Sequence, residues 1–531
     1  MALLELRVMD GPNPDIPAPA IRVTMTAPAE PDLDLTGLVD RIAQLADAYV
    51  GPAVQRHGAD GTVIVAFPWR WDGTGEALAE ALGRVVETGP EVPLDERVAA
   101  AVLRVRAARR GGPPRSVDPP IPTVAVTGTN GKTTTTRLLG RMAAEAGLRP
   151  AWSSTDGVFL AGECVEAGDW SGPGGAREVL AQPGVGFAVL ETARGGLMRR
   201  GMGVSAVDVA VMTNVSADHL GLEGIDTVEQ LAWAKSTVVR VVRPGGWAVL
   251  NAEDPLVAQF HDAGPGRPWF FALDPDGEGA ARARALGAPL AAPVGGRLVL
   301  TGWQGDPVDL GDLLDMPVTL AGLSQENIAN ALAAASAGLA VGLPVAAVRD
   351  GLRSFSTDVA DSPGRMNIWT VPGAGGGSAT VILDFAHNEA GAEALMRVAV
   401  GLRRRGALVH ASIGNAGDRT DEGIRELARI AGRMADTVQL AAKPHYLRGR
   451  SQAEIDDLQR EGLREVGVRP IDETPDEPSG LRALLGRASD GDVVAMMVHQ
   501  DREECVDILS AAGAVPAGPE RIRELASAAR G

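Results

Sequence analysis

The sequence is poor in several features, and each shortage excludes a class of protein. Its 531 residues contain two cysteines, Cys164 and Cys505, which excludes a disulfide framework and a cysteine-based zinc cluster. No stretch approaches about 18 consecutive apolar residues, so we expect no membrane span. Acidic residues outnumber basic ones by 68 to 50, and the net charge of −18 disfavours nucleic acid as a partner. The first residues lack a basic segment followed by an apolar one, which predicts a cytoplasmic protein.

Lysine is the scarcest charged residue. It occurs only as Lys132, Lys235 and Lys443, whereas arginine fills the other cationic positions. A lysine ammonium is a compact point charge that can lose its proton and react, and an arginine guanidinium stays protonated. The three lysines are therefore candidates for roles that arginine cannot perform.

The length suggests roughly three domains, and the pattern of apolar runs predicts an α/β protein. Strand-like and helical segments alternate over residues 1–112, which predicts a small α/β domain. A Pro/Gly-rich stretch around 111–122 then interrupts regular structure. Buried strand-like runs alternate with helices over 120–355 and again over 360–531, which is typical of parallel sheets covered by helices.

One helix of the first region carries an explicit prediction. The segment 35–50 places Leu38, Ile42, Leu45 and Tyr49 at positions i, i+4, i+7 and i+11. This spacing predicts a helix with these four side chains on one apolar face.

A glycine-containing turn joins the apolar run 123–127 to a helical segment. Successive backbone N–H groups at such a helix N-terminus attract a polyphosphate, a lysine there reaches the outer phosphates, and the next hydroxyl binds Mg²⁺. Val126 stands where the general phosphate-binding loop has its first glycine. The nucleotide-binding residues predicted here are Gly128, Thr129, Asn130, Gly131, Lys132, Thr133 and Thr134.

Polar residues follow the next two apolar runs. Glu191 ends the run from 187, and Asn214 and His219 follow the run 207–212. Because the carboxyl ends of parallel strands form the ligand-binding edge of an open α/β sheet, we expect these side chains on one rim. A carboxylate and an imidazole beside phosphates suit a divalent metal, although His219 taken alone is more typical of an ordinary loop or core histidine. Lys235 follows on a helix that can return it to that rim, where a neutral amine could add CO₂.

These segments resemble the Mur ligase family of ATP-dependent amide-bond-forming enzymes. The resemblance implies a central phosphate-loop domain and a C-terminal Rossmann-like domain. It also implies two Mg²⁺ ions held by Thr133, Glu191, His219 and Lys235, the last as a carbamate. Further motifs match the family, with two departures. Glu326 stands where many members have a histidine, and Phe385 stands where members usually have a tyrosine. They assign nucleotide contacts to Asn327, Asn330, Arg365, Asp384 and His387, and a catalytic role to Lys132, Glu191, His219, Lys235 and Arg365.

Within the family, segments 191–201, 218–226 and 417–427 are similar to the Mur-type half of cyanophycin synthetase, and the early segment 10–13 is similar to its N-terminal domain. That enzyme carries an ATP-grasp domain where this sequence has a short Pro/Gly linker. The resemblance implies that the chain attaches an amino acid to a carboxylate and that it self-associates. A separate ATP-grasp protein is a further partner that the sequence leaves open.

Arginines and the last lysine are candidates for substrate binding. Arg194, Arg199 and Arg200 follow Glu191 closely, and their forked side chains suit a carboxylate, with a solvated basic loop as the alternative. Lys443 lies in the C-terminal region, where the family binds its amine substrate. Two other functions stay open: a kinase or ATPase that does not ligate, and a silent subunit that partners an ATP-grasp ligase.

Overall fold

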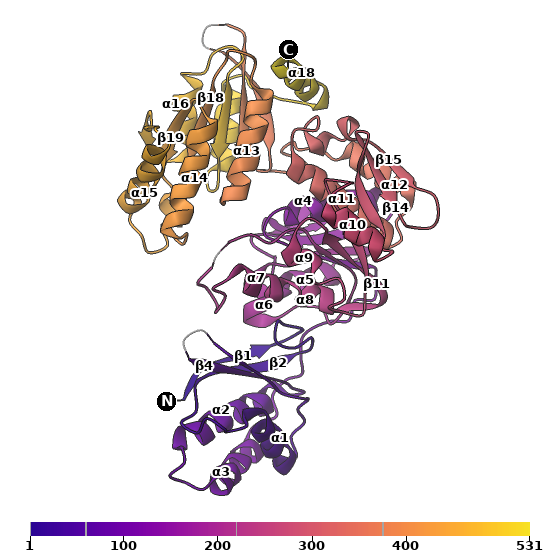
Figure 1. The fold of residues 1–531 in the computed structure, drawn as a ribbon, viewed down its shortest axis with the longest axis vertical. Coiled ribbons are helices and arrows are strands. Elements are labelled where there is room, and N and C mark those ends of the chain that lie inside the picture. The colour runs from indigo at the N-terminus through magenta and orange to yellow at the C-terminus, as the bar shows by residue number, and fades with distance from the viewer. Residues whose placement is uncertain (1, 59–60, 219, 374–375, 531) are drawn as a thin grey trace. The chain divides into compact units, whose positions relative to one another are not determined.

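The computed structural model describes residues 2–58, 61–218, 220–373 and 376–530. The described chain divides into two compact units. The first comprises Met1–Thr136, Gly147–Phe270 and Ala337–Leu343, and the second comprises Arg137–Ala146, Phe271–Ser336 and Pro344–Gly531. Figure 1 traces the elements of both. The α/β fold predicted from the alternating apolar runs is confirmed.

The first unit begins with an antiparallel sheet of order β1-β2-β4-β3, whose one face is covered by helices (Figure 1). Ile21, Val23 and Met25 alternate along β2 and belong to the core beneath those helices, as the two-residue period of a strand requires. The elements are β1 (Leu3–Met9), β2 (Ala20–Thr26), α1 (Leu35–Ala46), β3 (Val54–His57), β4 (Thr62–Pro68), α2 (Asp72–Thr88) and α3 (Leu94–Ala107).

The prediction for α1 was wrong in its second half. Leu38 and Ile42 are buried, but Leu45 and Tyr49 are 48% and 65% exposed. The helix ends at Ala46 because Asp47 adopts a left-handed backbone with φ 56°. Beyond that point the helical spacing no longer applies, so Tyr49 cannot join the apolar face.

The rest of the first unit is built on a mainly parallel sheet of order β12-β11-β10-β5-β9-β6-β7-β8. Strands β5, β9, β10 and β11 run parallel, so their carboxyl ends form one edge. The strands are β5 (Thr123–Thr127), β6 (Pro150–Ser154), β7 (Gly157–Leu160), β8 (Glu163–Ala167), β9 (Phe187–Glu191), β10 (Val207–Met212), β11 (Val242–Asn251) and β12 (Arg267–Phe271). The helices are the first residues of α4 (Lys132–Glu145), which belongs to the second unit from Arg137 onward, and α5 (Pro173–Ala181), α6 (Arg194–Arg200), α7 (Val228–Lys235), α8 (Thr237–Arg240) and α9 (Pro255–Ala258).

The second unit opens with α10 (Glu278–Ala285) and an antiparallel array of β13 (Leu290–Val294), β14 (Arg297–Thr301) and β15 (Val308–Asp312). Two 3-10 turns follow, η1 (Leu313–Asp315) and η2 (Pro317–Thr319). The helices α11 (Gln325–Ala340) and α12 (Val345–Ser354) come next. The apolar face of α12 is buried through Ala347, Val348 and Leu352.

The C-terminal part of the second unit has a sheet of order β20-β19-β18-β21-β17-β16-β22. Its elements are β16 (Asn367–Pro372), β17 (Ser378–Asp384), α13 (Glu389–Leu402), β18 (Val409–Ile413), α14 (Asp421–Met434), β19 (Thr437–Ala441), η3 (Pro444–Tyr446), α15 (Gln452–Glu465), β20 (Glu473–Thr474), α16 (Glu477–Leu485), β21 (Val493–Met497), α17 (Arg502–Ala511), β22 (Val515–Pro516) and α18 (Pro519–Arg530).

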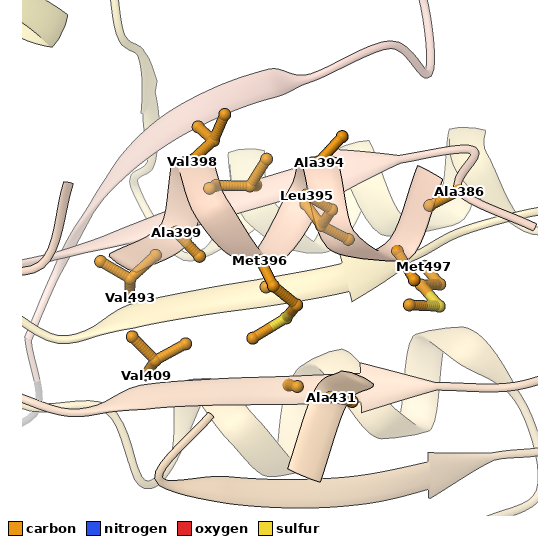
Figure 2. Close-up of a cluster of buried hydrophobic side chains, with 14 of the residues drawn as sticks. Ala386, Ala394, Leu395, Met396, Val398, Ala399, Val409, Ala431, Val493 and Met497 are labelled. Atoms are coloured by element: carbon orange, nitrogen blue, oxygen red, sulfur yellow. The ribbon is translucent and has the colours of Figure 1, made fainter. Parts of the chain in front are cut away.

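A dense apolar core holds this C-terminal sheet. Figure 2 shows Met396 and Ala399 of α13 facing the strands that carry Val409 and Val493. Strands β17, β21, β18 and β19 run parallel, so the loops that follow them share one edge. Across the described ranges, no helix is long and apolar enough to cross a membrane.

Candidate active site

The turn between β5 and α4 has the backbone geometry of a phosphate cradle. Gly128 has φ +154° and Gly131 has φ +85°, which L-residues with side chains rarely adopt. A Cβ on Gly128 would lie 1.9 Å from the Thr213 hydroxyl oxygen. Glycine is therefore required at this position for the turn to pack against the end of β10.

Residues that follow β10 fix this turn through hydrogen bonds. The Thr213 hydroxyl donates to the Asn130 carbonyl at 2.6 Å. The Asn214 side chain accepts from the Asn130 amide at 2.9 Å and donates to its carbonyl at 3.1 Å. The Thr129 amide donates to the Asn214 carbonyl at 2.8 Å. The cradle is thus held by contacts from the neighbouring strand end as well as by its own helix.

A hydroxyl and a carboxylate meet directly beside the turn. The Thr133 hydroxyl, on the first turn of α4, donates to Glu191 Oε2 at 2.9 Å. Glu191 ends β9, and only 2% of its surface is exposed. The predicted proximity of Glu191 to the phosphate-binding turn follows from the parallel pairing of β5 with β9.

Two lysines converge on the same turn. Lys132 donates from Nζ to the Thr129 carbonyl at 2.8 Å, and Lys235 donates to the Gly128 carbonyl at 2.6 Å. Lys235 is the last residue of α7, and 4% of its surface is exposed. Burial lowers the pKa of Lys235 to about 7 because the ammonium loses hydration, and the charge of Lys132 adds to this effect. The attraction of Asp218 and Glu191 acts in the opposite direction. His219, predicted as a metal ligand, lies outside the described residues.

The three arginines predicted to bind substrate lie on α6. Arg194 donates to the Leu222 carbonyl at 2.7 Å, and burial lowers its pKa. Arg199 is largely exposed and approaches Glu223 at 3.4 Å. Arg200 is exposed. Their substrate contacts stay predictions.

The other predicted nucleotide contacts lie in the second unit. On α11 the Asn330 side chain donates to that of Asn327 at 3.2 Å, and both are buried. The Arg365 guanidinium lies 4.6 Å from the Phe385 ring centre. Burial raises the pKa of Asp384, whose carboxylate accepts from the Met366 amide at 2.8 Å. The His387 ring lies 3.1 Å from the Phe385 carbonyl through Nδ1.

Lys443 occupies a different environment from the one expected of a substrate contact. Its side chain is fully buried, forms an ion pair with Glu477 and donates to the Met497 carbonyl at 2.6 Å. A substrate would have to displace these partners to reach the amine. Its role in substrate binding stays a prediction.

Comparison with known proteins identifies the family. Residues 126–338 match the Mur ligase middle domain, and residues 364–498 match the domain described as Mur ligase, glutamate ligase domain. The UDP-N-acetylmuramyl-tripeptide synthetase of Deinococcus radiodurans is 30% identical over 419 residues, which cover 75% of this chain and 76% of that protein. The chain belongs to the Mur ligase family. The resemblance read from its motifs is therefore confirmed.

Other members are more similar in sequence but longer. The cyanophycin synthetase of Synechocystis is 39% identical over 400 residues, which cover 73% of this chain and 44% of that protein. The cyanophycin synthetase of Crocosphaera subtropica is 35% identical, and the match covers 47% of that protein. The chain thus spans less than half the length of these two relatives.

Solved structures agree with the family fold. A structure of Escherichia coli FolC in complex with ADP, without folate substrate, has a TM-score of 0.52 at 20% identity, over 75% of this chain and 90% of FolC. A pseudomurein peptide ligase type C from Methanothermus fervidus has a TM-score of 0.50 at 20% identity, over 74% of this chain and 79% of that one. These likenesses support the fold.

The residues around the turn fit a metal-bound nucleotide. The cradle leaves no room for a side chain at Gly128, and the Thr133 hydroxyl and Glu191 carboxylate are oxygen donors of the kind that Mg²⁺ prefers. Within the described ranges, no group of three or more His, Cys, Asp and Glu side chains gathers into a metal cage.

Sequence reasoning missed part of what supports the site. Asn214 was expected on the rim, but its bonds to Asn130 were not foreseen. The scarcity of asparagine in the sequence was the available signal. Nothing in the sequence indicated that Glu477 is the partner of Lys443, because the two lie on separate elements and match no motif.

Proposed function

We propose that this chain is an ATP-dependent ligase that joins a carboxylate substrate to the amine of an amino acid through a peptide or isopeptide bond. The observation that supports the proposal is the convergence of Thr133, Glu191 and Lys235 on the phosphate-binding turn. Family membership agrees with it, since the relatives compared above include synthetases and ligases.

The proposed reaction activates the acid before the amine attacks. An oxygen of the carboxylate takes the γ-phosphoryl group of ATP, giving an acyl phosphate and ADP. The amine then adds to the acyl carbon, and phosphate and a proton leave as the amide forms. Because charge spreads over the transferred group, catalysis here consists of positioning and electrostatic stabilisation.

In this proposal, the backbone amides of the turn hold the nucleotide phosphates, and Lys132 neutralises the outer ones. Thr133, Glu191, His219 and Lys235 would hold Mg²⁺, which supplies charge neutralisation when bound. Arg365 would contact the phosphates. Asn327, Asn330, Asp384 and His387 would contact the nucleotide, as the family resemblance assigns them.

We propose further that Lys235 carries a carbamate. Its amine is buried, and the charges of Lys132 and Arg194 would stabilise a negative group there, although Asp218 and Glu191 would oppose it. A neutral amine adds CO₂ and releases one proton, which converts a cation into a carboxylate that can ligate a metal. The lowered pKa of Lys235 provides the neutral form.

The amino acid would bind in the region matched by the glutamate ligase domain, residues 364–498. The carboxylate substrate would be held by Arg194, Arg199 and Arg200 near Glu191. An aspartyl or glutamyl compound is the class of acid that we propose. Cytoplasmic location, self-association and a separate ATP-grasp partner stay predictions.

A paired-substrate screen tests the ligase proposal. Purified chain with Mg-ATP is offered acids and amino acids singly and in pairs, and ADP release is followed together with product mass. We expect sustained ADP release and an amide product only when both partners are present. Sustained release without any amine would indicate a kinase or ATPase, and no release with any pair would indicate a silent subunit.

A Lys235→Arg variant tests the carbamate. The arginine keeps a positive charge but cannot add CO₂, so we expect turnover to fall about 10²-fold or more, the size seen when one transition-state-stabilising group is removed. A Lys235→Ala variant should regain part of its turnover on addition of formate or acetate. Wild-type turnover in Lys235→Arg would overturn the carbamate and leave the ligase proposal standing.

A further inference from the structure

The carboxyl edge of the C-terminal sheet is formed by the loops that follow β17, β18, β19 and β21. Ligands of open α/β sheets bind at such an edge. Ring side chains gather there: Phe385, His387, Tyr446 and His499 have centroids 5.1 to 6.5 Å apart in the pairs that contact one another. The arrangement of these loops therefore determines the shape of the edge.

A buried carboxylate organises the loop after β21. Glu477, at the start of α16, is fully buried and paired with Lys443. Its Oε1 accepts from the His499 amide at 2.7 Å, and its Oε2 accepts from the amides of Gln500 and Asp501 at 3.1 and 3.0 Å. One side chain thus satisfies three consecutive backbone donors as well as the ammonium.

The partner lysine links the loop after β19 to the same point. Lys443 donates to the Met497 carbonyl at 2.6 Å. It immediately precedes η3, where the His445 amide donates to the Gln500 side chain at 2.8 Å. The Tyr446 carbonyl accepts from the Gly417 amide at 2.8 Å. The loop after β18 is therefore connected to the pair through η3.

The fourth loop is reached through His499. Its Nε2 lies 2.7 Å from the Ala386 carbonyl, so Nε2 carries the proton and donates. Ala386 precedes His387 in the loop after β17. All four edge loops are consequently connected to the Lys443–Glu477 pair by hydrogen bonds.

Burying both the Lys443 and the Glu477 charge lowers the stability gained from their ion pair. Two ions removed from water lose hydration, and a hydrophobic pair of similar volume is often as stable or more stable. Burial lowers the pKa of Lys443 despite the attraction of Glu477. Stability alone therefore does not explain this buried ion pair. It is better explained by the arrangement of the four loops that its hydrogen bonds hold.

We propose that Lys443 and Glu477 form a positioning pair, which holds the four edge loops in the arrangement that binds the amino-acid substrate. This inference rests on the proposed ligase function and on binding of the amino acid in this region. It assigns Lys443 an indirect role, since its amine contacts protein groups. Glu477 becomes a positioning residue that touches no substrate.

The opposite edge of the same sheet supplies a matched control. Asp492, just before β21, is also a buried carboxylate, and it accepts from the amides of Leu408 and Ser489 at 2.7 Å each. It lies 3.4 Å from the His410 ring. Asp492→Asn therefore perturbs a comparable buried network at the amino ends of the strands.

Wild-type turnover is first established in the two-substrate assay, so that a failure of the ligase proposal is recognised before any variant is tested. The experiment then compares Glu477→Gln with Asp492→Asn. We expect Glu477→Gln to raise the KM for the amino acid about tenfold, the order of loss when one hydrogen-bonding partner is removed. The KM for ATP should rise by a smaller factor, because only the loop after β17 carries proposed nucleotide contacts. Asp492→Asn should lower the melting temperature without changing either KM. An unchanged amino-acid KM in Glu477→Gln, or an equal rise in Asp492→Asn, would overturn the proposal.

A double variant decides the case in which Glu477→Gln does not fold. Lys443→Met with Glu477→Gln removes both charges, so no unpaired ion is buried and folding is expected. A glutamine carbonyl cannot serve the three amides as the carboxylate does, so we expect the raised amino-acid KM to persist and amide exchange at 499–501 to quicken. Wild-type KM in the folded double variant would show that the pair is merely structural.

Discussion

At the scale of single residues, the half-buried imidazole of His499 has an unusual protonation behaviour. Burial lowers its pKa well below 6.5, and the nearby charge of Lys443 adds to the effect. The folded chain keeps this ring neutral in a pH range where an unfolded chain binds a proton. Its contribution to stability is therefore full above about pH 6.5 and is lost as the pH falls towards the folded pKa.

We predict that His499→Gln reduces this pH dependence. The stability advantage of wild type over the variant should shrink between pH 7.5 and pH 5.5, with a slope of up to about 1.4 kcal/mol per pH unit. Urea unfolding at the two pH values measures the difference. An advantage of equal size at both would contradict the assignment.

The lysines show what a sequence can and cannot predict about single residues. Lys132 was assigned from a local motif, and it lies at the turn as expected. Lys235 was placed near the rim because helices in such folds return to the sheet edge, and its contact with Gly128 agrees. Lys443 was singled out because lysine is scarce and because it lies in the region where the family binds its amine substrate. Its ion pair with Glu477 depends on long-range packing that no motif records.

At the scale of elements, α7 determines where the Lys235 amine lies. A capping box at Thr227 and Gln230 starts the helix, and Lys235 ends it. Because the helix is short, loss of the cap affects its whole length. The position of the amine is thus linked to the hydrogen bonds of the first turn.

We predict that Thr227→Ala lowers the free energy of unfolding by about 1 kcal/mol and reduces turnover several-fold. Asp34→Ala, which removes the cap of α1 through its bond to the Gly37 amide, is the control. It should lower stability similarly and leave turnover unchanged. Urea unfolding and steady-state rates measure both, and equal turnover in the two variants would count against the link.

The elements themselves were predictable where the pattern was strong. Apolar runs located β5, β9 and β10 because a strand covered on both faces is continuously apolar. The exposed hairpin strand β8 has no such run and was not foreseen. The end of α1 was missed because a left-handed residue such as Asp47 leaves little trace in an apolar pattern.

At the scale of the molecule, the N-terminal sheet supports the loop that leads to α7. Arg7 on β1 donates to the Met198 carbonyl at 3.0 Å and pairs with Glu223 at 2.5 Å. Glu223 has φ 60°, an uncommon backbone for this residue. The sequence could not predict these contacts, because they join segments far apart in the chain.

We predict that Arg7→Ala lowers turnover several-fold by releasing this loop. The control is Arg41→Ala, which removes an exposed ion pair with Asp95 in the same N-terminal region. Exposed pairs contribute at most about 1 kcal/mol, so the control should change little. Steady-state rates measure the effect, and a similar loss in both variants would argue against a specific support.

The burial of two of the three lysines gives the molecule an unusual chemical selectivity. Of the three lysines, Lys132 alone has a side chain that is partly exposed. A mild acylating reagent would therefore label the phosphate-binding turn and little else. Protection of that single label by a nucleotide would give a direct footprint of occupancy, even before any substrate pair is known.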